Sequence, residues 1–378
     1  MERRFLLSSW IRLTLCEGIG SATQRKLLRE FGLPEQIFAL PHHEIARVAG
    51  DRKARLLLDN RADKKIDTAL QWAAQDGNHI ITLADAAYPQ HLLEIADPPV
   101  LLYAKGDISL LQAPAIAVVG ARSATAQGEE NARNFAKALA DAGLKIISGL
   151  ALGIDVAAHE GALLSSGSSA IAVIGTGADR VYPAAHRDMA HRIVQQGVVV
   201  SEFPLGTPPQ AHNFPKRNRI IAGLSRGVLV VEAAESSGSL ITARLAAEMG
   251  REVFAVPGSI HSPLSRGCHQ LIKQGATLVE TVSDILQEFP AAISLFASPP
   301  VSQPSEISHP AKRQDEQQTL TAHPLDGQID HALGFDPVDV DTLVQRSGVA
   351  PDILYARLLC WELEGRVARL PGNRYQRL

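Results

Sequence analysis

AIAVV at residues 115–119 is the first of seven short apolar runs that decide the fold of this chain. The others are KIIS (145–148), AIAVI (170–174), VVVSEF (198–203), VLVVEA (228–233), EVFAV (252–256) and TLVE (277–280). Helical patterns such as ENARNFAKALADAG (130–143) and LITARLAAEMG (240–250) lie between them. Short apolar strands that alternate with helices are typical of a parallel sheet covered on both faces. The sequence therefore predicts an α/β fold with a doubly wound, mostly parallel, Rossmann-like sheet.

The flanking sequence divides the chain into four predicted parts. Residues 1–77 carry short helical patterns punctuated by glycine and proline, which predict a small helical module. Residues 78–289 form the α/β domain, entered through the strand-like runs HIITL and VLLYAKG. Residues 290–329, rich in Ser, Pro and Gln, predict a flexible linker. Residues 330–378 contain two helical patterns and a hairpin, which predict a winged-helix domain.

Composition restricts the kind of protein. The 378 residues carry a net charge of −3 and 46% hydrophobic residues, so any nucleic-acid contact must be a local patch. The three cysteines are widely separated and form no CxxC pair, which favours a reducing, cytoplasmic compartment over a disulfide framework. No run approaches the roughly eighteen apolar residues of a membrane span, so membrane insertion is not expected.

The helical module contains one pattern with two interpretations. GIGSATQRKLL, at residues 18–28, places two glycines before a helix that carries basic residues. This pattern is half of a helix-hairpin-helix, in which glycines let backbone amides approach a DNA phosphate. It is equally a corner between two ordinary helices, as in a SAM-like helical module. Both interpretations remain open.

The loops that follow the strands predict an anion-binding groove. Loops at the carboxyl ends of parallel strands share one edge of the sheet, where ligands bind. Glycines allow close backbone approach, and hydroxyls and amides at helix starts donate to phosphate. Turn geometry and helix capping explain any one such loop, but four on one edge favour anion binding. The residues concerned are Gly120, Arg122, Ser123, Thr125, Ser148, Gly149, Gly153, Gly175, Gly177, Gly238 and Ser239.

FPKRNRIIAGLS, at residues 214–225, sets three cations at the start of a predicted helix. The positive end of a helix dipole disfavours cations, so a bound polyanion, paired carboxylates or solvent must compensate for Lys216, Arg217 and Arg219. Beside the four loops, the cluster favours a polyanion. We expect Arg217 and Arg219 to neutralise phosphates, Phe214 to stack on a base, and Lys216 to point to solvent.

Other ligand classes lack their signatures. GxxxxGK[ST] does not occur, and Arg180 occupies the third-glycine position of GxGxxG, so no ATP or NAD cofactor is expected. The histidines have no metal-ligand spacing, so no metal is expected. Asp155 and His159, four residues apart, are either an acid–base pair or an ordinary helix-surface pair, and we assign no catalytic residue. Cys268 has no partner and is expected to be a buried thiol.

The loops together resemble the DNA-processing protein A family (DprA, also called Smf). The matching text runs from residue 88 to about residue 285 and is highly specific, because many long matches follow in order. It comprises YPQHLLEIADPPVLLYAKGD, VVGARSATAQG, SGLALGIDVAAHEGAL, AVIGTGADRVYP, VVVSEFPLGTPP, FPKRNRIIAGLS, VVEAAESSGSLITARLAAEMGREVFAVPG and LIKQGATLV.

The resemblance implies a homodimer that binds single-stranded DNA through its Rossmann-like domain and loads RecA recombinase during natural transformation, without catalysis. By motif, Arg122 and Arg187 would face the DNA backbone. The pocket would be lined by Phe214, Arg217, Asn218 and Arg219. The chain departs from the family pattern at His186 and His269, where asparagine is usual.

Two other functions remain open from the residues alone. Related Rossmann-like enzymes hydrolyse nucleotides, and Glu232 could serve as their acid or base, although their PGGxGT loop is missing. The other is a pure adaptor that presents surfaces to recombinase and uptake partners. The winged helix carries six arginines against six acidic residues between 331 and 378, so duplex binding, protein contact and dimer support are alternatives there.

Overall fold

The computed structural model describes residues 2–59, 62–167, 169–289, 326–333 and 337–378. The chain divides into two compact units. One comprises residues 1–289 without 125–131, and the other comprises 125–131 and 290–378. Most of the predicted linker lies outside the described residues, and helix α16 (Asp326–Leu333) begins within its last four positions. No helix among the described residues is long and apolar enough to cross a membrane.

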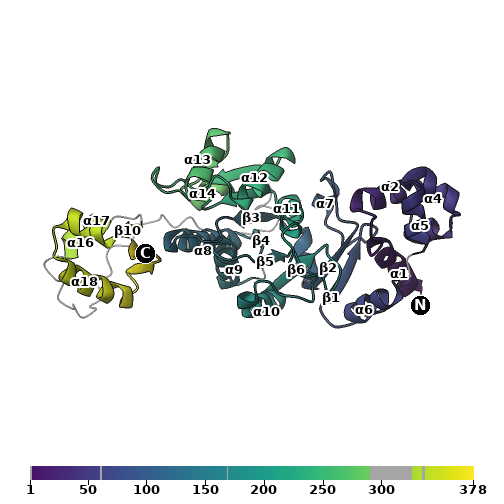
Figure 1. The fold of residues 1–378 in the computed structure, drawn as a ribbon, viewed down its shortest axis with the longest axis horizontal. Helices are drawn as coiled ribbons and strands as arrows, with labels where there is room; N and C mark the ends of the chain where they lie inside the picture. Colours follow the sequence, from purple (N-terminus) through teal and green to yellow (C-terminus); the bar gives the residue numbers. More distant parts are fainter. Residues whose placement is uncertain (1, 60–61, 168, 290–325, 334–336) are drawn as a thin grey trace, which may run out of the picture. The chain divides into compact units, whose positions relative to one another are not determined.

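A nine-stranded sheet forms the centre of the larger unit (Figure 1). Its spatial order is β1-β2-β6-β5-β4-β3-β7-β8-β9, with seven parallel strands from β6 to β9 and antiparallel β2 and β1 at one edge. The strands are β1 Asn78–Thr82, β2 Leu101–Gly106, β3 Ala115–Val119, β4 Lys145–Ser148, β5 Ala170–Val173, β6 Gly197–Ser201, β7 Gly227–Val230, β8 Glu252–Ala255 and β9 Thr277–Leu278. All seven apolar runs form strands, which confirms the predicted fold class.

The helices of the α/β region follow the strands in alternation. They are α7 Gln90–Leu93, α8 Ala126–Asp141, α9 Ile154–Leu164, α10 Arg187–Gln196, α11 Asn213–Leu224, α12 Gly238–Glu248, α13 Arg266–Lys273 and α14 Val282–Leu286, with 3-10 turns at Ile108–Gln112 and Ala184–His186. Figure 1 shows α9 and α10 on one face of the sheet and α11, α12 and α13 on the other. Because both faces are covered, every residue of β3 is buried, which explains its unbroken apolar sequence.

Six short helices make up the N-terminal module: α1 Glu2–Thr14, α2 Ser21–Phe31, α3 Pro34–Ala39, α4 His42–Ala49, α5 Asp51–Leu58 and α6 Asp63–Ala73. Their buried core, which includes Trp10, Leu27 and Trp72, also contains Val100, Leu101 and Tyr103 from the entry to β2 and the strand itself. The sequence separates the module from the α/β domain at residue 77, whereas the structure joins them in one compact unit.

The C-terminal unit has the predicted helices and hairpin. Helices α17 (Val340–Ser347) and α18 (Pro351–Leu363) precede strands β11 (Val367–Leu370) and β12 (Arg374–Arg377). A short strand, β10 (Val338–Asp339), adds to β12 and completes a three-stranded sheet. Leu354, Leu358 and Trp361 on one side of α18 are fully buried in the core of this domain.

Candidate nucleic-acid interface

The candidate site lies at β3, where the order in which the chain adds strands to the sheet reverses direction. From β3 the chain builds outward through β4, β5 and β6, and then α11 crosses back so that β7 lies on the other side of β3. The loops after β3 and β7 therefore diverge and leave a crevice, as doubly wound sheets do at such a switch point. A pocket of about 630 Å³ occupies this crevice, with Gly120 and Arg122 on one side and Ser237, Gly238 and Ser239 on the other.

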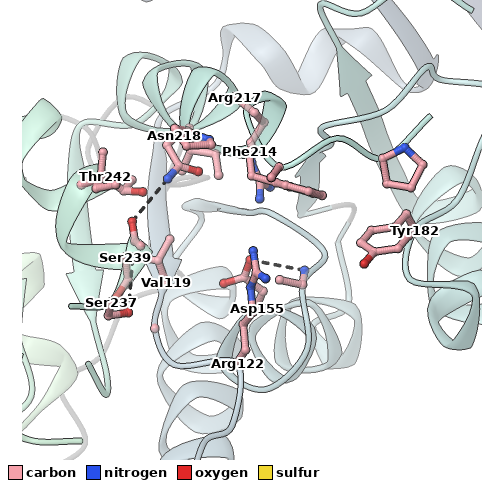
Figure 2. A pocket seen from close by; sticks show the side chains of 18 residues that line it. Val119, Arg122, Asp155, Tyr182, Phe214, Arg217, Asn218, Ser237, Ser239 and Thr242 are labelled. Carbon is pink, nitrogen blue, oxygen red and sulfur yellow. Dashed lines mark hydrogen bonds between the residues drawn. The ribbon is translucent and has the colours of Figure 1, made fainter. Parts of the chain in front are cut away.

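The first turn of α11 forms the opposite wall of the pocket. Figure 2 shows Phe214 and Arg217 projecting from this helix toward Arg122 and Asp155, and Asn218 pointing toward Ser239. The Asn218 side-chain amide donates to the Gly238 carbonyl, 3.3 Å away, which ties α11 to the start of α12. The segment FPKRNR thus joins the glycine-rich loops in one site.

Arg217 is buried rather than presented to a ligand, with only 4% of its surface exposed. Its Nη1 donates to the Val173 carbonyl at 2.5 Å, and its guanidinium packs so closely on Gly149 that no side chain would fit there. Burial lowers the pKa of Arg217 to about 10, against the raising effect of nearby Asp155. The expectation that Arg217 directly neutralises phosphate has to be modified, because most of its side chain forms the floor of the pocket.

Asp155 also lines the pocket, and its carboxylate organises the loop after β4. Its carboxylate accepts the amide N–H groups of Gly149 (3.1 Å) and Ala151 (3.3 Å). Burial raises the pKa of Asp155, while Arg217 lowers it. His159, one helical turn further along α9, is fully buried, and neither ring nitrogen has a hydrogen-bond partner. Asp155 therefore holds the loop, and the burial of both side chains leaves no exposed acid–base dyad.

Arg219 does not line the pocket. Its guanidinium pairs with the Glu202 carboxylate, and its Nε lies 3.2 Å from Asp97. Its side chain is only 12% exposed. The neighbouring Lys216 is exposed, consistent with the expectation that it points to solvent. Of the three cations in the segment, Lys216 is the exposed one, while Arg219, expected to neutralise a phosphate, pairs with carboxylates of the chain itself.

Aromatic and cationic side chains meet at the pocket entrance. The Phe214 ring lies 5.8 Å from the Tyr182 ring, centroid to centroid, and the Arg122 guanidinium carbon lies 5.5 Å from the Phe214 centroid. Gly175 packs against Phe214 so closely that an added Cβ would lie 3.0 Å from the ring atom Cδ1. Arg122 itself is exposed and forms no ion pair with a described residue. An exposed cation over one aromatic ring, with a second ring beside the first, suits a strand of nucleotides.

The structure separates the predicted loop residues into two groups. The pocket is lined by Gly120, Arg122, Phe214, Arg217, Asn218, Gly238 and Ser239. The remainder shape the loops or lie next to the pocket without lining it: Ser123, Thr125, Ser148, Gly149, Gly153, Gly175, Gly177, Arg187 and Arg219.

Three of these loop residues have clear structural roles. The Ser148 hydroxyl is buried and donates to the Val118 carbonyl, and Thr125 Oγ1 accepts the Gly128 N–H as a helix cap. Gly153 has a φ of +71° and packs against the carbonyls of Ala121 and Arg122, where a side chain would collide with backbone. At these three positions, turn geometry and helix capping, rather than anion binding, explain the residue type.

Sequence reasoning missed Tyr182, Pro209 and Thr242, which also line the pocket. Tyr182 has a sequence signal, since an exposed aromatic residue after a glycine-rich βα loop is a typical base contact. Pro209 and Thr242 have none, because only the crossover of α11 brings their segments to the crevice.

The histidines that replace the family's usual asparagines both bond to backbone. His186 Nδ1 lies 3.0 Å from the Leu150 carbonyl, and His269 Nε2 lies 3.0 Å from the Gly258 carbonyl. Cys268 is buried as expected, and burial raises the pKa of its thiol to about 12. Among the residues that the structure describes, no three His, Cys, Asp or Glu side chains are placed to hold a metal.

The fold and the pocket define a class: a doubly wound α/β protein with a polar and aromatic pocket at its topological switch point, linked to a winged helix. Two family models match the chain. Residues 79–290 match DNA recombination-mediator protein A, and residues 310–373 match the DprA winged helix domain. The chain belongs to the DNA recombination-mediator protein A family.

Its relatives cover most of its length. It is 42% identical to Protein Smf of Escherichia coli over 83% of this chain and 81% of the relative. It is 35% identical to Protein Smf of Synechocystis over 97% and 98% of the two chains. The X-ray structure of DNA processing protein A from Streptococcus pneumoniae superposes with a TM-score of 0.68, at 40% identity over 75% of this chain and 98% of that one.

One further solved structure concerns nucleic acid directly. It is described as showing the single-stranded DNA binding mode of DNA processing protein A from Helicobacter pylori. That structure has a TM-score of 0.51 and 30% identity, over 56% of this chain and 96% of its own.

Proposed function

We propose that this chain acts in DNA processing as a recombination mediator by holding single-stranded DNA in the switch-point pocket. The observation that carries the proposal is Arg122, an exposed cation without an ion-pair partner among the described residues, beside Phe214 and Tyr182. The Gly238 amide at the start of α12 adds a donor for a phosphate, whereas the Ser239 amide already donates to the N-cap Ser237 hydroxyl. Contact with backbone and base faces, rather than base edges, predicts little sequence preference.

The experiment is a titration of fluorescent oligo-dT at several salt concentrations. Affinity should fall steeply with salt, and Arg122→Ala should weaken binding and reduce the slope of log affinity against log salt by about one unit. Arg52→Ala is the matched control, since Arg52 is an exposed arginine on α5, outside the pocket. Binding that does not depend on salt, or equal effects of the two variants, would contradict the proposal.

Arg217 supplies a second, distinguishable outcome. Removing its buried guanidinium leaves Asp155 without its nearest cation and leaves a space above Gly149. Arg217→Ala should therefore lower the free energy of unfolding, on the order of 3 kcal/mol, in addition to weakening DNA binding. Chemical denaturation separates the two arginines, because Arg122→Ala should leave stability unchanged.

The protein is proposed to bind without catalysis. Asp155 is the carboxylate among the described pocket residues, and its oxygens already accept two backbone amides beside a buried arginine. Glu232, the acid considered for a nucleotide hydrolase, is not among the residues that line the pocket. Release of free base from a nucleotide over many turnovers would favour the hydrolase instead.

Partners and location complete the proposal. RecA recombinase is proposed as the partner that receives the single-stranded DNA. The α/β domain is proposed to form the interface of a homodimer. Three dispersed cysteines favour the cytoplasm as the compartment. Light scattering of the purified protein tests the dimer, and strand exchange by RecA on oligonucleotides coated with a single-strand binding protein tests the loading step.

A further inference from the structure

A second cavity, of about 560 Å³, adjoins the switch-point pocket. Tyr182 and Pro209 belong to the walls of both, so the two spaces meet at these residues. The volume lies within the range of small-molecule sites, about 300–1,000 Å³. The cavity is therefore large enough for one nucleoside and open toward the proposed DNA path.

The lining of this cavity has the chemistry of a nucleobase site. Its floor is apolar, and Leu150, Ile174, Ala190 and Val199 are each at most 5% exposed. Lys105 and His191 add polar side chains to the lining, while Thr176, also in the lining, donates its hydroxyl to the Arg180 carbonyl. A flat aromatic base presents apolar faces and hydrogen-bonding edges, which this combination of surfaces suits.

The rim of the cavity is cationic. Arg180 and Arg187 line it, and both are exposed. Neither forms an ion pair with any residue that the structure describes. Asp179, the acidic residue of the lining, is held by the Gly206 amide, which donates to both of its carboxylate oxygens at 2.8 and 3.0 Å. The two arginines are thus available for a phosphate at the mouth.

We propose that this cavity receives the base of the nucleotide adjacent to the one held in the switch-point pocket. The inference rests on the proposed function and adds a second subsite to it. The strand passes over the Tyr182 ring, which is 48% exposed between the two spaces. Arg122 neutralises the phosphate on one side of the ring, and Arg187 neutralises the phosphate on the other. The base between them leaves the stack and enters the cavity.

Two adjacent alanines provide a matched pair of variants. Ala184 and Ala185 are both exposed in the 3-10 turn Ala184–His186, but only Ala184 lines the cavity. Ala184→Trp should obstruct the cavity, whereas Ala185→Trp should place the same bulk outside it. Thermal denaturation checks the fold of both. If Ala184→Trp does not fold, Ala178→Leu, at another lining position, takes its place.

The probe is oligo-dT carrying a single abasic residue, moved one position at a time. A missing base should cost wild-type protein about tenfold in affinity at two positions, one for Phe214 and one for the cavity. Ala184→Trp should abolish the sensitivity at the position assigned to the cavity and keep the one assigned to Phe214. Phe214→Ala should abolish the Phe214 position and keep the cavity position. Ala185→Trp should behave as wild type.

The outcomes separate this inference from the function on which it depends. If the profile has one sensitive position, or if Ala184→Trp retains both, the cavity holds no base, although DNA binding stands. If wild-type protein does not bind intact oligo-dT, the proposed function itself is wrong.

Discussion

Lys216, Arg217 and Arg219 differ in burial, and this difference reverses the roles that the sequence predicts for them. In sequence, Arg217 and Arg219 are the best candidates for phosphate contact, because guanidinium groups grip phosphate in pairs of hydrogen bonds. In the structure, both are engaged by the protein itself, through the Val173 carbonyl and the Glu202 carboxylate. Exposed cations among the described residues of this edge include Arg122, Arg180, Arg187 and Lys216. Position along a helix does not reveal which side chain turns inward.

A buried histidine predicts how stability depends on pH. Burial, with Arg217 and His186 nearby, lowers the pKa of His159 to about 3 from its usual 6.5. Below pH 6.5 the unfolded chain binds a proton that the folded chain does not, so folding weakens as the pH falls. The loss is about 1.4 kcal/mol per pH unit, or roughly 2 kcal/mol at pH 5. Chemical denaturation at pH 7.5 and pH 5 measures it.

His159→Leu is the control, because leucine takes no proton. The difference between variant and wild type should grow as the pH is lowered from 6.5 to 5. Asp155, whose pKa is raised by burial, acts in the opposite direction, but it is present in both proteins. An identical pH dependence in both would show that His159 does not titrate on unfolding.

At the scale of elements, helix α11 connects the sheet to the site. It crosses from the β6 side to the β7 side, carries Phe214 and Asn218 into the pocket, and buries Ile220 and Ile221 in the core. Arg219 anchors it through Glu202, and Asp97 lies between Arg219 and Arg25 of the helical module. The module is thereby linked by ion pairs to the helix that forms the pocket wall.

This anchoring gives a prediction that contrasts with Arg122. Arg219→Ala leaves Glu202 buried without its cation, so the free energy of unfolding should fall, by roughly 3 kcal/mol. Oligo-dT affinity should decline because α11 is less well held, while the salt slope should stay as in wild type. Titration at several salt concentrations measures both. A slope reduced by about one unit would instead place Arg219 on a phosphate.

The winged helix presents a different kind of surface. The arginine of α18, Arg357, forms a two-pronged pair with Asp326, with N–O distances of 2.8 and 2.5 Å. The exposed side of the same helix carries Ile353, Leu359 and Leu363. Such a face is poorly suited to phosphate, so of the alternatives left open by the sequence, protein contact fits this domain better than duplex binding.

At the scale of the whole molecule, the complete pocket lies in the larger unit. All of its lining residues fall between Val119 and Thr242. A chain that ends at Phe289 should therefore bind oligo-dT with unchanged affinity and salt dependence. The same fluorescence titration, on the full chain and the shortened one, tests this. A large loss of affinity would mean that the C-terminal unit contributes directly to the strand.

The sequence by itself determined the sheet, its seven parallel strands, the winged helix and the edge on which the site lies. Periodicity and composition report these features because each strand must be apolar wherever both faces of the sheet are covered. Glycine-rich loops likewise mark the carboxyl edge, as Gly120 and Gly238 do.

Only the tertiary structure decided which side chains line the candidate pocket. Ser148 and Arg217 satisfy buried carbonyls, Arg219 satisfies a carboxylate, and Pro209 reaches the pocket from a segment with no sequence signal. These roles depend on partners that lie far away in sequence, for instance Val173, 44 positions before Arg217. A buried polar group must find such a partner, and the chain can choose among partners only once it is folded.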